Sequence, residues 1–555
     1  MKLVNVWRLL LLGVLLTSTA AYSQTWNWAA QIATFSTGGF GTNKVRGVTV
    51  DQNENIYVIG DYGDSALIGG TKVKGFGGGA EMYVAKFNSA GTAAWVRSFG
   101  SSGFLDQSID ITNDPTGNVY VCGSFFGNWD FGTQQFPFGS ATVGLAKYNS
   151  DGDVQWAKVV PGVFAGPGGI AYGFDHIYVA IGRSFTKFEM DGDTVWTRTI
   201  PTSVSYSVDY RDVTVDIWGC IYLTGQFKGT ITYGTDVLTS SGTNDPDIFI
   251  VKYDPTGTVM WARKAGAVST PGQEDIGHGI TTSPHGDVYL VGQYRGKAGF
   301  GTDSISVGNA ILGMFAAKYD SEGALQWVKG SSGTNGSSAL AYGVRVLAND
   351  DVLISASYGI GVTFADTTIT IAGGGDVLLI RLSSDGVRRW AKRSDTFVTS
   401  CGVMCMATNA AGTSAYSGGQ FSTTITFGPT TMTIAAGVTD GWLGKMTFPT
   451  ITAVREIDDV PHPWSFQLSQ NYPNPFNPTT NIEFRIIVAS RVSVDIFNSL
   501  GQKVKTLVDQ ELPAGSYATE WDGADDSGRK VASGVYFYRM QAADYTDTRK
   551  MTLLK

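Results

Sequence analysis

Histidines, which often carry acid–base and metal chemistry near neutral pH, are scarce in this chain. There are four of them, His176, His278, His285 and His462, and none has the neighbours of a zinc motif such as H-E-x-x-H. A G-x-S-x-G nucleophile turn and a phosphate-binding P-loop are also missing from the sequence. His285 falls in a predicted hairpin turn and His462 in a predicted linker, so we expect both to be solvated. The sequence therefore predicts no catalytic residue, no metal site and no cofactor.

Side chains suited to binding are more frequent, and they fall in segments that connect one repeat of the chain to the next. Aromatic, acidic and basic groups of this kind can hold a glycan or a peptide. The candidate ligand-binding residues are Phe104, Asp106, Tyr206, Tyr210, Arg211, Glu274, Asp275 and His278. One alternative is that these are exposed loops without a ligand. Another is a glycoside-cleaving pair of carboxylates near Asp106, Asp209 or Glu274, because distant loops can assemble such a pair.

A repeated β-hairpin is the element that must position these loops. Its first copy is Glu81–Ser98, where a strand containing Lys86 leads into an Asn-Ser-Ala-Gly turn and a strand containing Trp95 returns. The other complete copies are Leu145–Lys158, Phe185–Arg198, Ile248–Arg263, Phe315–Lys329 and Leu378–Lys392. Each has a Lys or Arg before the turn and a Trp after it.

The two ends of the array carry one unpaired strand each. Trp28 lies in a returning strand with no outgoing partner, and Lys445 lies in an outgoing strand with no return. Outgoing strands occur at Lys86, Lys147, Lys187, Lys252, Lys318, Arg381 and Lys445, and returns at Trp28, Trp95, Trp156, Trp196, Trp261, Trp327 and Trp390. Pairing the two ends would close a ring and remove the exposed strand edges of an open array. The sequence thus predicts a seven-bladed β-propeller whose last blade is split between the termini.

The blades differ in one place that can be read from spacing. Most repeats add a Phe/Tyr-Gly-Thr bend, as at Phe300-Gly301-Thr302, which predicts a short accessory ribbon. Trp156 and Trp196 are only 40 residues apart, so we expect that blade to lack the ribbon. The strands are apolar on both faces, which predicts blades sandwiched between neighbours and a packing role for the recurring Trp.

Composition and the N-terminal segment limit the class of protein and its expected location. The chain has 555 residues, 71 glycines and a formal net charge of −8, which suits short strands and argues against nucleic acid. Residues 1–23 have a charged start, the apolar run Leu9–Leu16 and small residues before Gln24, as in a secretory signal peptide. Without another apolar run, we expect no transmembrane segment in the mature chain. The four cysteines are expected to be buried thiols, since Cys401 and Cys405 are too far apart on a strand to bridge.

Two phrases of the repeat resemble a known family. Gly47-Val48-Thr49-Val50-Asp51 with Asn55-Ile56-Tyr57-Val58, and Tyr83-Val84-Ala85-Lys86-Phe87-Asn88, are similar to the bacterial β-propeller repeats called SBBP, and the first phrase also to NHL repeats. The resemblance spans about residues 25–448. It implies a propeller but no particular activity.

The C-terminal part has a different character. After a polar, proline-bearing linker at 449–465, residues 466–555 contain about seven short strands, which predict a small immunoglobulin-like β-sandwich. The segment resembles the type A C-terminal sorting domain of type IX secretion. The residues that carry the resemblance include Asn471, Tyr472, Pro473, Asn474, Pro475, Phe476, Asn477, Pro478, Gly534, Val535, Tyr536 and Lys550. A plain structural sandwich of the related FlgD-like type is the alternative.

These observations give an all-β chain with four parts: a signal peptide at 1–23, the propeller at 24–448, the linker at 449–465 and the sandwich at 466–555. The sorting-domain resemblance implies that the translocon and sorting machinery of type IX secretion are its partners, and that the protein is secreted or attached to the outer-membrane surface. We expect a non-catalytic binding or adhesion propeller with a glycan or peptide ligand. An extracellular polysaccharide hydrolase or lyase, or a structural surface-layer component, are the alternatives.

Overall fold

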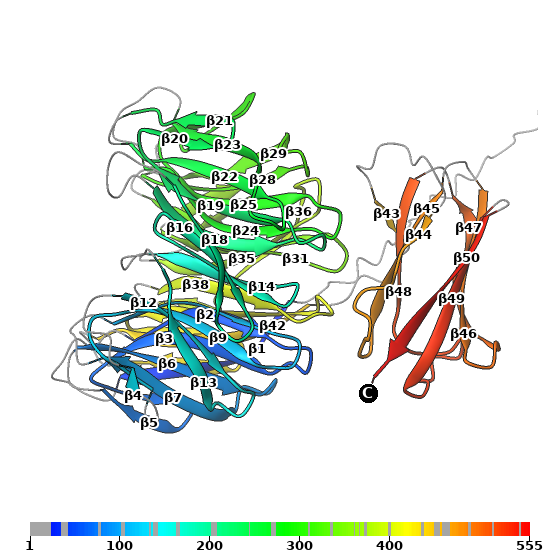
Figure 1. Ribbon diagram of the computed structural model, residues 1–555, viewed down its shortest axis with the longest axis horizontal. Helices are drawn as coiled ribbons and strands as arrows, with labels where there is room; N and C mark the ends of the chain where they lie inside the picture. Colours follow the sequence, from blue (N-terminus) through cyan, green and yellow to red (C-terminus); the bar gives the residue numbers. More distant parts are fainter. Residues whose placement is uncertain are drawn as a thin grey trace, which may run out of the picture.

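The computed structural model describes 22 segments of the chain. They are residues 24–34, 43–75, 79–101, 106–131, 135–136, 142–161, 167–200, 208–242, 245–267, 274–308, 311–333, 337–359, 361–365, 367–370, 375–397, 401–434, 438–448, 455–457, 467–486, 490–512, 515–542 and 545–554. All regular elements within these segments are β-strands, so the predicted all-β class is confirmed (Figure 1). The described residues form no helix long and apolar enough to cross a membrane.

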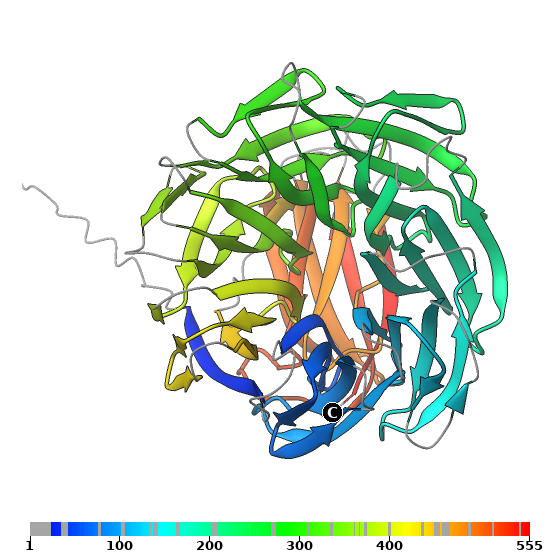
Figure 2. The ribbon, with the colours of Figure 1, turned by 90° about the vertical axis from the view of Figure 1, so that its left-hand side faces the viewer.

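The main body repeats one four-stranded antiparallel unit around an axis (Figure 2). The first units are β2 (Lys44–Val50), β3 (Ile56–Gly63), β6 (Ala80–Phe87) and β7 (Ala93–Ser101); β8 (Gln107–Asn113), β9 (Val119–Phe125), β12 (Thr142–Tyr148) and β13 (Val154–Val159); and β14 (Gly168–Gly173), β15 (His176–Ile181), β16 (Ser184–Glu189) and β17 (Thr194–Thr199).

Three further units continue the ring in the same order. They are β18 (Val208–Val215), β19 (Ile221–Phe227), β22 (Asp247–Tyr253) and β23 (Val259–Ala267); β24 (Ile276–Thr282), β25 (Val288–Tyr294), β28 (Gly313–Tyr319) and β29 (Leu325–Gly330); and β31 (Ala339–Val346), β32 (Val352–Tyr358), β35 (Asp376–Leu382) and β36 (Arg388–Arg393). In each unit the first strand is the inner one, next to the axis, and the fourth is the outer one.

The last unit joins the two ends of the array. Its inner strand is β38 (Cys401–Thr408), followed by β39 (Ser414–Phe421) and β42 (Asp440–Thr447), and its outer strand is β1 (Thr25–Thr34). Trp28 pairs with Lys445, as Trp95 pairs with Lys86 in the first unit. The predicted closure of the ring by one strand from each end is therefore confirmed.

In most units, the chain segment that connects the second strand to the third forms a short ribbon. These ribbons are β4 (Ser65–Ile68) with β5 (Thr71–Lys74), β10 (Trp129–Asp130) with β11 (Gln135–Phe136), β20 (Thr230–Tyr233) with β21 (Asp236–Thr239), β26 (Lys297–Phe300) with β27 (Asp303–Ser306), β33 (Gly361–Phe364) with β34 (Thr367–Thr370), and β40 (Thr424–Phe427) with β41 (Thr430–Thr433). Several pair with the preceding unit, through β1, β7 and β23 or through β30 (Ser332–Gly333) and β37 (Thr396–Phe397). As predicted, β15 runs through Gly182 and Arg183 directly into β16 with no ribbon between them.

The recurring Trp connects neighbouring units through what we call the outer-hairpin contact. Trp95 Nε1 donates a hydrogen bond of 3.0 Å to Ser150 O, in the outer turn of the next unit. Gly152 in that turn has φ +83°, and a Cβ there would lie 2.6 Å from the Trp95 ring, so the position requires glycine. The same glycine–tryptophan approach recurs for Gly91 with Trp28, Gly192 with Trp156, Gly257 with Trp196, Gly323 with Trp261 and Gly386 with Trp327. The predicted packing role of this Trp is confirmed.

The core lies between the units. The strands β9, β22, β25, β28 and β35 are buried along their whole length, which confirms that both faces are covered. Cys122, Cys401 and Cys405 are free and buried, as expected, whereas Cys220 is partly exposed.

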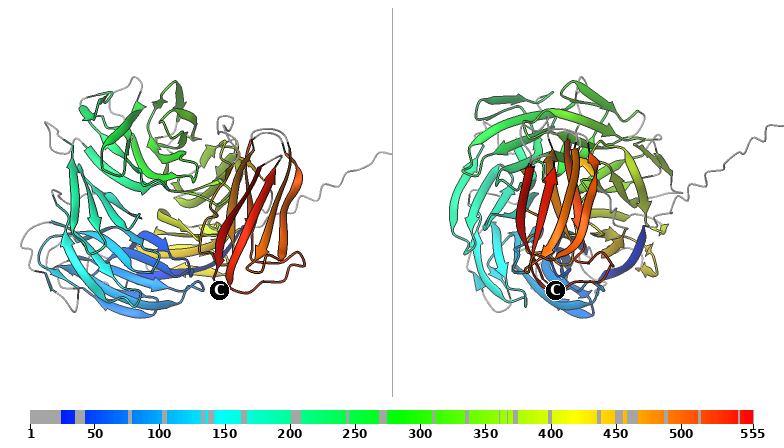
Figure 3. Two further views of the ribbon diagram at one scale, coloured as in Figure 1. Left: turned by 45° about the vertical axis from the view of Figure 1, so that its right-hand side comes forward. Right: turned by 90° about the vertical axis from the view of Figure 1, so that its right-hand side faces the viewer.

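The C-terminal part is a sandwich of two four-stranded sheets. One sheet has the order β43 (Arg455–Ile457), β48 (Gly515–Trp521), β45 (Thr480–Ile486), β44 (Gln467–Leu468), and the other β47 (Lys503–Leu512), β46 (Ser490–Asn498), β49 (Gly534–Ala542), β50 (Tyr545–Leu553). Its core is separate from those of the ring and includes Phe476, Trp521 and Tyr536. The sandwich covers the centre of one face of the ring (Figure 3).

Candidate functional site

A β-bulge recurs at one position of the inner strands. In six of the inner strands that the structure describes, the pairing with the second strand skips one residue. A bulge leaves this residue unpaired and redirects its side chain, and bulges are frequent beside functional sites. The six skipped residues, which we call the bulge ring, are Arg46, Ile109, Arg211, His278, Tyr342 and Met404. The remaining inner strand, β14, keeps its register.

Two cavities follow the axis of the ring and share four lining residues. The first, of about 230 Å³, is lined by all six residues of the bulge ring together with Pro167 and Gly168 before and in β14. The second, of about 290 Å³, is lined by residues from all seven inner strands. Val48, Asp110, Asp212 and Arg345 line both cavities. The two cavities are therefore parts of one axial channel, whose mouth is formed by the bulge ring.

Two basic side chains of the mouth have different surroundings. Arg46 forms an ion pair with Asp61, which also accepts a hydrogen bond of 2.7 Å from Ser108 N. Arg211 Nε is buried and has no hydrogen-bond partner among the described residues. Burial lowers the pKa of Arg211, and the charges of Asp209 and Glu274 oppose this shift. Arg211 therefore keeps one donor that is not hydrogen-bonded within the fold, whereas the Arg46 charge is already compensated.

His278 and Tyr342 form an aromatic pair beside Arg211. Their ring centroids are 5.0 Å apart with the planes tilted by 37°. His278 Nε2 lies 3.1 Å from Gln293 Oε1. Burial lowers the pKa of His278 to about 4, and the Arg211 charge acts in the same direction. The imidazole is therefore neutral at pH 7, and the pair offers an uncharged aromatic surface next to a guanidinium.

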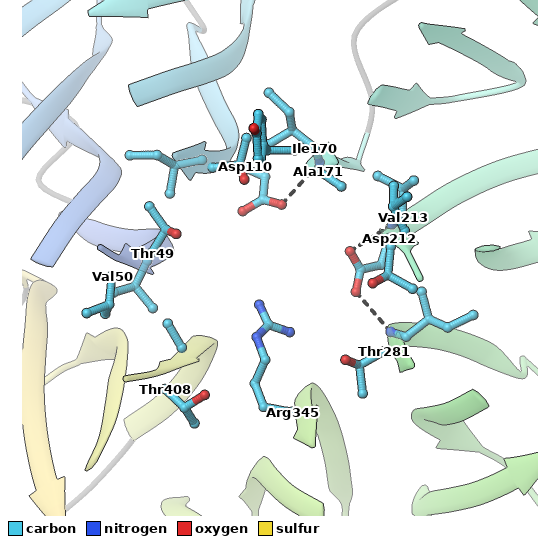
Figure 4. Close-up of a pocket in the computed structure, with 18 residues that line it drawn as sticks. Thr49, Val50, Asp110, Ile170, Ala171, Asp212, Val213, Thr281, Arg345 and Thr408 are labelled. Atoms are coloured by element: carbon cyan, nitrogen blue, oxygen red, sulfur yellow. Dashed lines mark hydrogen bonds between the residues drawn. The ribbon is translucent and has the colours of Figure 1, made fainter. Parts of the chain in front are cut away.

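Below the mouth, two carboxylates and one guanidinium line the part of the channel that both cavities share. We call Asp110, Asp212 and Arg345 the waist; they come from β8, β18 and β31 and point into the same space (Figure 4). Burial, followed by the Asp212 charge, raises the pKa of Asp110 to about 7. Burial raises the pKa of Asp212 to about 6, although the Arg345 charge opposes it.

The predicted site residues fall into three groups. Arg211 and His278 line the mouth of the channel. Glu274 is exposed and does not line either cavity, but its charge acts on Arg211. Phe104 and Tyr206 lie outside the described residues.

Asp106, Asp275 and Tyr210 are buried and line neither of the two cavities. Asp106 Oδ1 accepts a hydrogen bond of 3.0 Å from Phe126 N. Asp275 Oδ1 accepts one of 2.9 Å from Arg295 N. Each carboxylate thus ties the start of an inner strand to the end of the second strand. Tyr210 packs within the core between β14–β17 and the next unit, in contact with Phe249.

Sequence reasoning missed Arg46, Tyr342, Arg345, Asp110 and Asp212. The signal that could have found them is alignment of the repeats, because each bulge residue precedes the small or acidic residue Gly47, Asp110, Asp212, Gly279, Gly343 or Cys405. Among the described residues, no group of three or more His, Cys, Asp or Glu side chains could hold a metal ion. Asp106, Asp209 and Glu274 line neither of the two cavities.

His285 is not solvated as we expected, because the C-terminal sandwich packs over its turn. Its Nε2 lies 3.3 Å from Asp350 Oδ2 and 3.6 Å from Glu483 Oε1 of β45, and 13% of its side chain is exposed. Burial alone would lower the pKa of His285, but the hydrogen bond and charge of Asp350, together with Glu483, raise it. Asn481 Nδ2 also donates to Ala348 O at 3.4 Å. His462 lies outside the described residues.

The residues of the sorting-domain resemblance are mainly structural in the sandwich. Asn471 is buried, and its backbone N donates a 2.7 Å hydrogen bond to Tyr538 Oη. The centroid of the Trp521 ring lies 5.5 Å from that of Phe476 and 5.0 Å from that of Tyr536. Tyr472 and Val535 are exposed by 71% and 40%. The segment thus presents two apolar side chains at the surface while its other aromatic residues hold the core.

Comparison with known proteins gives one family match and one curated relative. The FlgD Ig-like domain family matches residues 475–545, so the C-terminal sandwich contains an Ig-like domain of this type. A WD repeat-containing protein of Acanthamoeba polyphaga mimivirus, described as uncharacterised, is 26% identical over 294 residues. The match covers 48% of this chain and 19% of that protein. The chain thus spans about a fifth of the relative's length.

Solved structures with related folds show low identity. The full extracellular region of plexin A4 has a TM-score of 0.39 and 8% identity, with 93% of this chain and 62% of that chain covered. The Pan2 WD40 domain of Neurospora crassa has a TM-score of 0.38 and 10% identity, with coverage of 78% and 98%. The C-terminal WD40 domain of Sif2 has a TM-score of 0.34 and 9% identity, with coverage of 74% and 100%.

Proposed function

We propose that this protein is a secreted or surface-displayed, non-catalytic binding propeller whose ligand enters through the bulge ring. One observation carries the proposal. The scaffold residues recur from unit to unit, whereas the bulge position holds Arg46, Ile109, Arg211, His278, Tyr342 and Met404. Six side chains of five types converging on one cavity give an asymmetric surface, as ligand recognition requires.

The chemistry of the mouth supports binding over catalysis. Arg211 Nε has no partner among the described residues, and the neutral His278 stands beside Tyr342. A guanidinium next to aromatic rings can hold a sugar ring or a peptide side chain without forming or breaking a bond.

We also propose that the propeller has seven blades of the SBBP type and that the sandwich is a type A sorting domain for type IX secretion. Support comes from the signal-like residues 1–23 and from the match of residues 475–545 to the FlgD Ig-like family. The exposed Tyr472 and Val535 are available for contact with an export partner.

Binding is tested with the full mature chain, from Gln24, on glycan and peptide arrays. The comparison variant is Arg211→Ala, with Arg491→Ala as the control because Arg491 is exposed on the sandwich. We expect a bound ligand for the parent chain and the control, and loss of binding for Arg211→Ala. The same glycans are assayed for reducing ends, and their release by the parent chain would overturn the non-catalytic function. Binding that Arg211→Ala leaves unchanged would place the ligand elsewhere.

Export is tested by expressing the chain in a bacterium with type IX secretion and measuring the protein in the medium and on the surface. Removal of residues 466–555 should retain the propeller in the periplasm. Secretion without those residues would contradict the proposed route.

A further inference from the structure

The waist holds more hydrogen-bonding capacity than the fold uses. Asp110 Oδ2 accepts a hydrogen bond of 3.2 Å from Ile170 N in the next inner strand. Asp212 Oδ1 accepts one of 2.8 Å from Val213 N, and its Oδ2 accepts one of 2.9 Å from Ile280 N. A carboxylate can accept about four hydrogen bonds, so both keep free acceptor positions. These positions face the channel.

Arg345 supplies the matching donors. Among the described residues, its guanidinium makes one hydrogen bond, from Nη1 to its neighbour Val344 O at 2.8 Å. Guanidinium has five N–H donors, so the others are available inside the channel. Its charge also acts on both aspartates, which places it between them electrostatically.

The charges of the waist disfavour a charged ligand. An anion attracted by Arg345 would meet the carboxyls of Asp110 and Asp212, and a cation attracted by these would meet Arg345. A buried charge that is not fully compensated costs several kcal/mol. A neutral group that both donates and accepts hydrogen bonds satisfies all three side chains without this cost.

The rest of the lining of the larger cavity includes five threonines. Four threonines, Thr49, Thr112, Thr214 and Thr281, lie at one level of the inner strands, and Thr408 lies one residue deeper. Cavities of about 230 and 290 Å³ that share residues lie at the small end of small-molecule sites. At the bulge ring, His278 and Tyr342 add an aromatic surface to the channel.

We propose that the waist binds one neutral, polyhydroxylated sugar unit that enters through the bulge ring, with Arg345 donating to its hydroxyl oxygens and Asp110 and Asp212 accepting from its hydroxyl groups. This inference rests on the proposed binding function and names the class of its ligand.

The test is a charge-matched sugar series on the full mature chain. Glucose, galactose and mannose are each compared with their uronate and their 2-amino derivative by calorimetry or saturation-transfer NMR at pH 7.5. We expect at least one neutral hexose to bind more tightly than both charged counterparts. Tighter binding of uronates or of amino sugars, or no binding by any member, would overturn the proposal.

Variants locate the sugar. Arg345→Gln should weaken binding of that hexose by at least about tenfold, since hydrogen bonds from a charged donor contribute about 1.5–3 kcal/mol. Thr281→Val, which keeps side-chain shape, should weaken it by a smaller factor, and Arg491→Gln on the sandwich should not change it. Circular dichroism and the melting temperature show whether Arg345→Gln is folded; if it is not, Thr281→Val decides.

The outcomes separate this inference from the proposed function. Loss of all array binding with Arg211→Ala, combined with unchanged hexose affinity for Arg345→Gln, would keep the mouth as a binding site and remove the sugar unit from the waist. Binding of peptides alone would do the same.

Discussion

The outer hairpins and the inner strands belong to the same repeat but use it in opposite ways. At the outer-hairpin contact, one Trp of each unit meets a positive-φ glycine of the next, as Trp95 meets Gly152 and Trp261 meets Gly323. At the bulge, six units present side chains of five different types to the channel. In this molecule, repetition marks the residues that hold the ring together, and variation at a fixed position marks those free to recognise a ligand.

The largest effect on stability is expected where the outer scaffold closes the ring. Trp26 in β1 is buried and packs 4.5 Å from the Phe427 ring and 6.5 Å from the Trp442 ring. Trp26→Ala should lower the free energy of unfolding by about 3–5 kcal/mol, because it removes a large buried side chain. Urea denaturation measures this, with Trp218→Ala as a control because Trp218 is 54% exposed. Equal losses for the two variants would contradict a closing joint at Trp26.

The outer-hairpin contact can be separated from backbone strain by two glycines with similar φ. Gly152 has φ +83° and faces Trp95, whereas Gly229 has φ +73° and a methyl group added there would meet no atom within 4 Å. Gly152→Ala should cost about 1–3 kcal/mol more than Gly229→Ala, because only the first adds a clash. Melting temperatures of the two variants give the difference. If they fall equally, packing on the Trp is not what fixes the glycine.

Asp110 of the waist should make the free energy of unfolding depend on pH. The pKa of Asp110 is raised to about 7 in the folded chain, from 3.8 in the unfolded chain, so folding favours its protonated form. Stability from this group is therefore gained as the pH falls below about 7 and is absent above it. Asparagine does not titrate, so Asp110→Asn should lack this gain. From pH 8 to pH 5, the free energy of unfolding of the parent chain should rise by about 1–2 kcal/mol more than that of the variant. Parallel denaturation curves at both pH values would show that the carboxyl is not perturbed.

The smallest effect is expected from the bulge ring itself. Arg211→Ala should change the free energy of unfolding by less than about 0.5 kcal/mol, because Arg211 Nε donates no hydrogen bond to any described residue. Arg97→Ala at the outer-hairpin contact is the matched variant, because its guanidinium donates to Gly152 O at 2.9 Å and to Asp151 O at 3.1 Å. It should cost about 1–2 kcal/mol. Urea denaturation measures both costs. A larger loss of stability for Arg211→Ala than for Arg97→Ala would contradict the assignment of stability to the outer hairpins.

The scaffold could be predicted from the sequence because its determinants are local. The Lys-to-Trp spacing across a short turn fixes the hairpin, and the predicted pairs Lys86–Trp95 and Trp28–Lys445 are the observed ones. The short spacing from Trp156 to Trp196 likewise indicated the unit without a ribbon.

The candidate site could be predicted only in part, because a bulge adds one residue without changing the apolar alternation on either side. Arg211 and His278 were found through the loops that precede them, whereas Arg345 lies near the end of β31 and carries no turn signal. The carboxylates of Asp106 and Asp275 accept backbone hydrogen bonds inside the fold, a role that their position before a strand does not reveal. The burial of His285 depends on Glu483, nearly two hundred residues away, and no local pattern reports such a contact.

The position of β1 has a consequence for how the molecule is assembled. Thr25–Thr34 leads the described chain, yet its partner Asp440–Thr447 follows more than four hundred residues later. The strand made first must therefore wait, unpaired on one side, until almost the whole propeller has emerged, and contacts this distant in sequence form slowly. Once β42 has emerged, its edge is open to the leading strand of another copy until its own β1 pairs with it, so exchange of that strand between molecules is the characteristic error of this architecture.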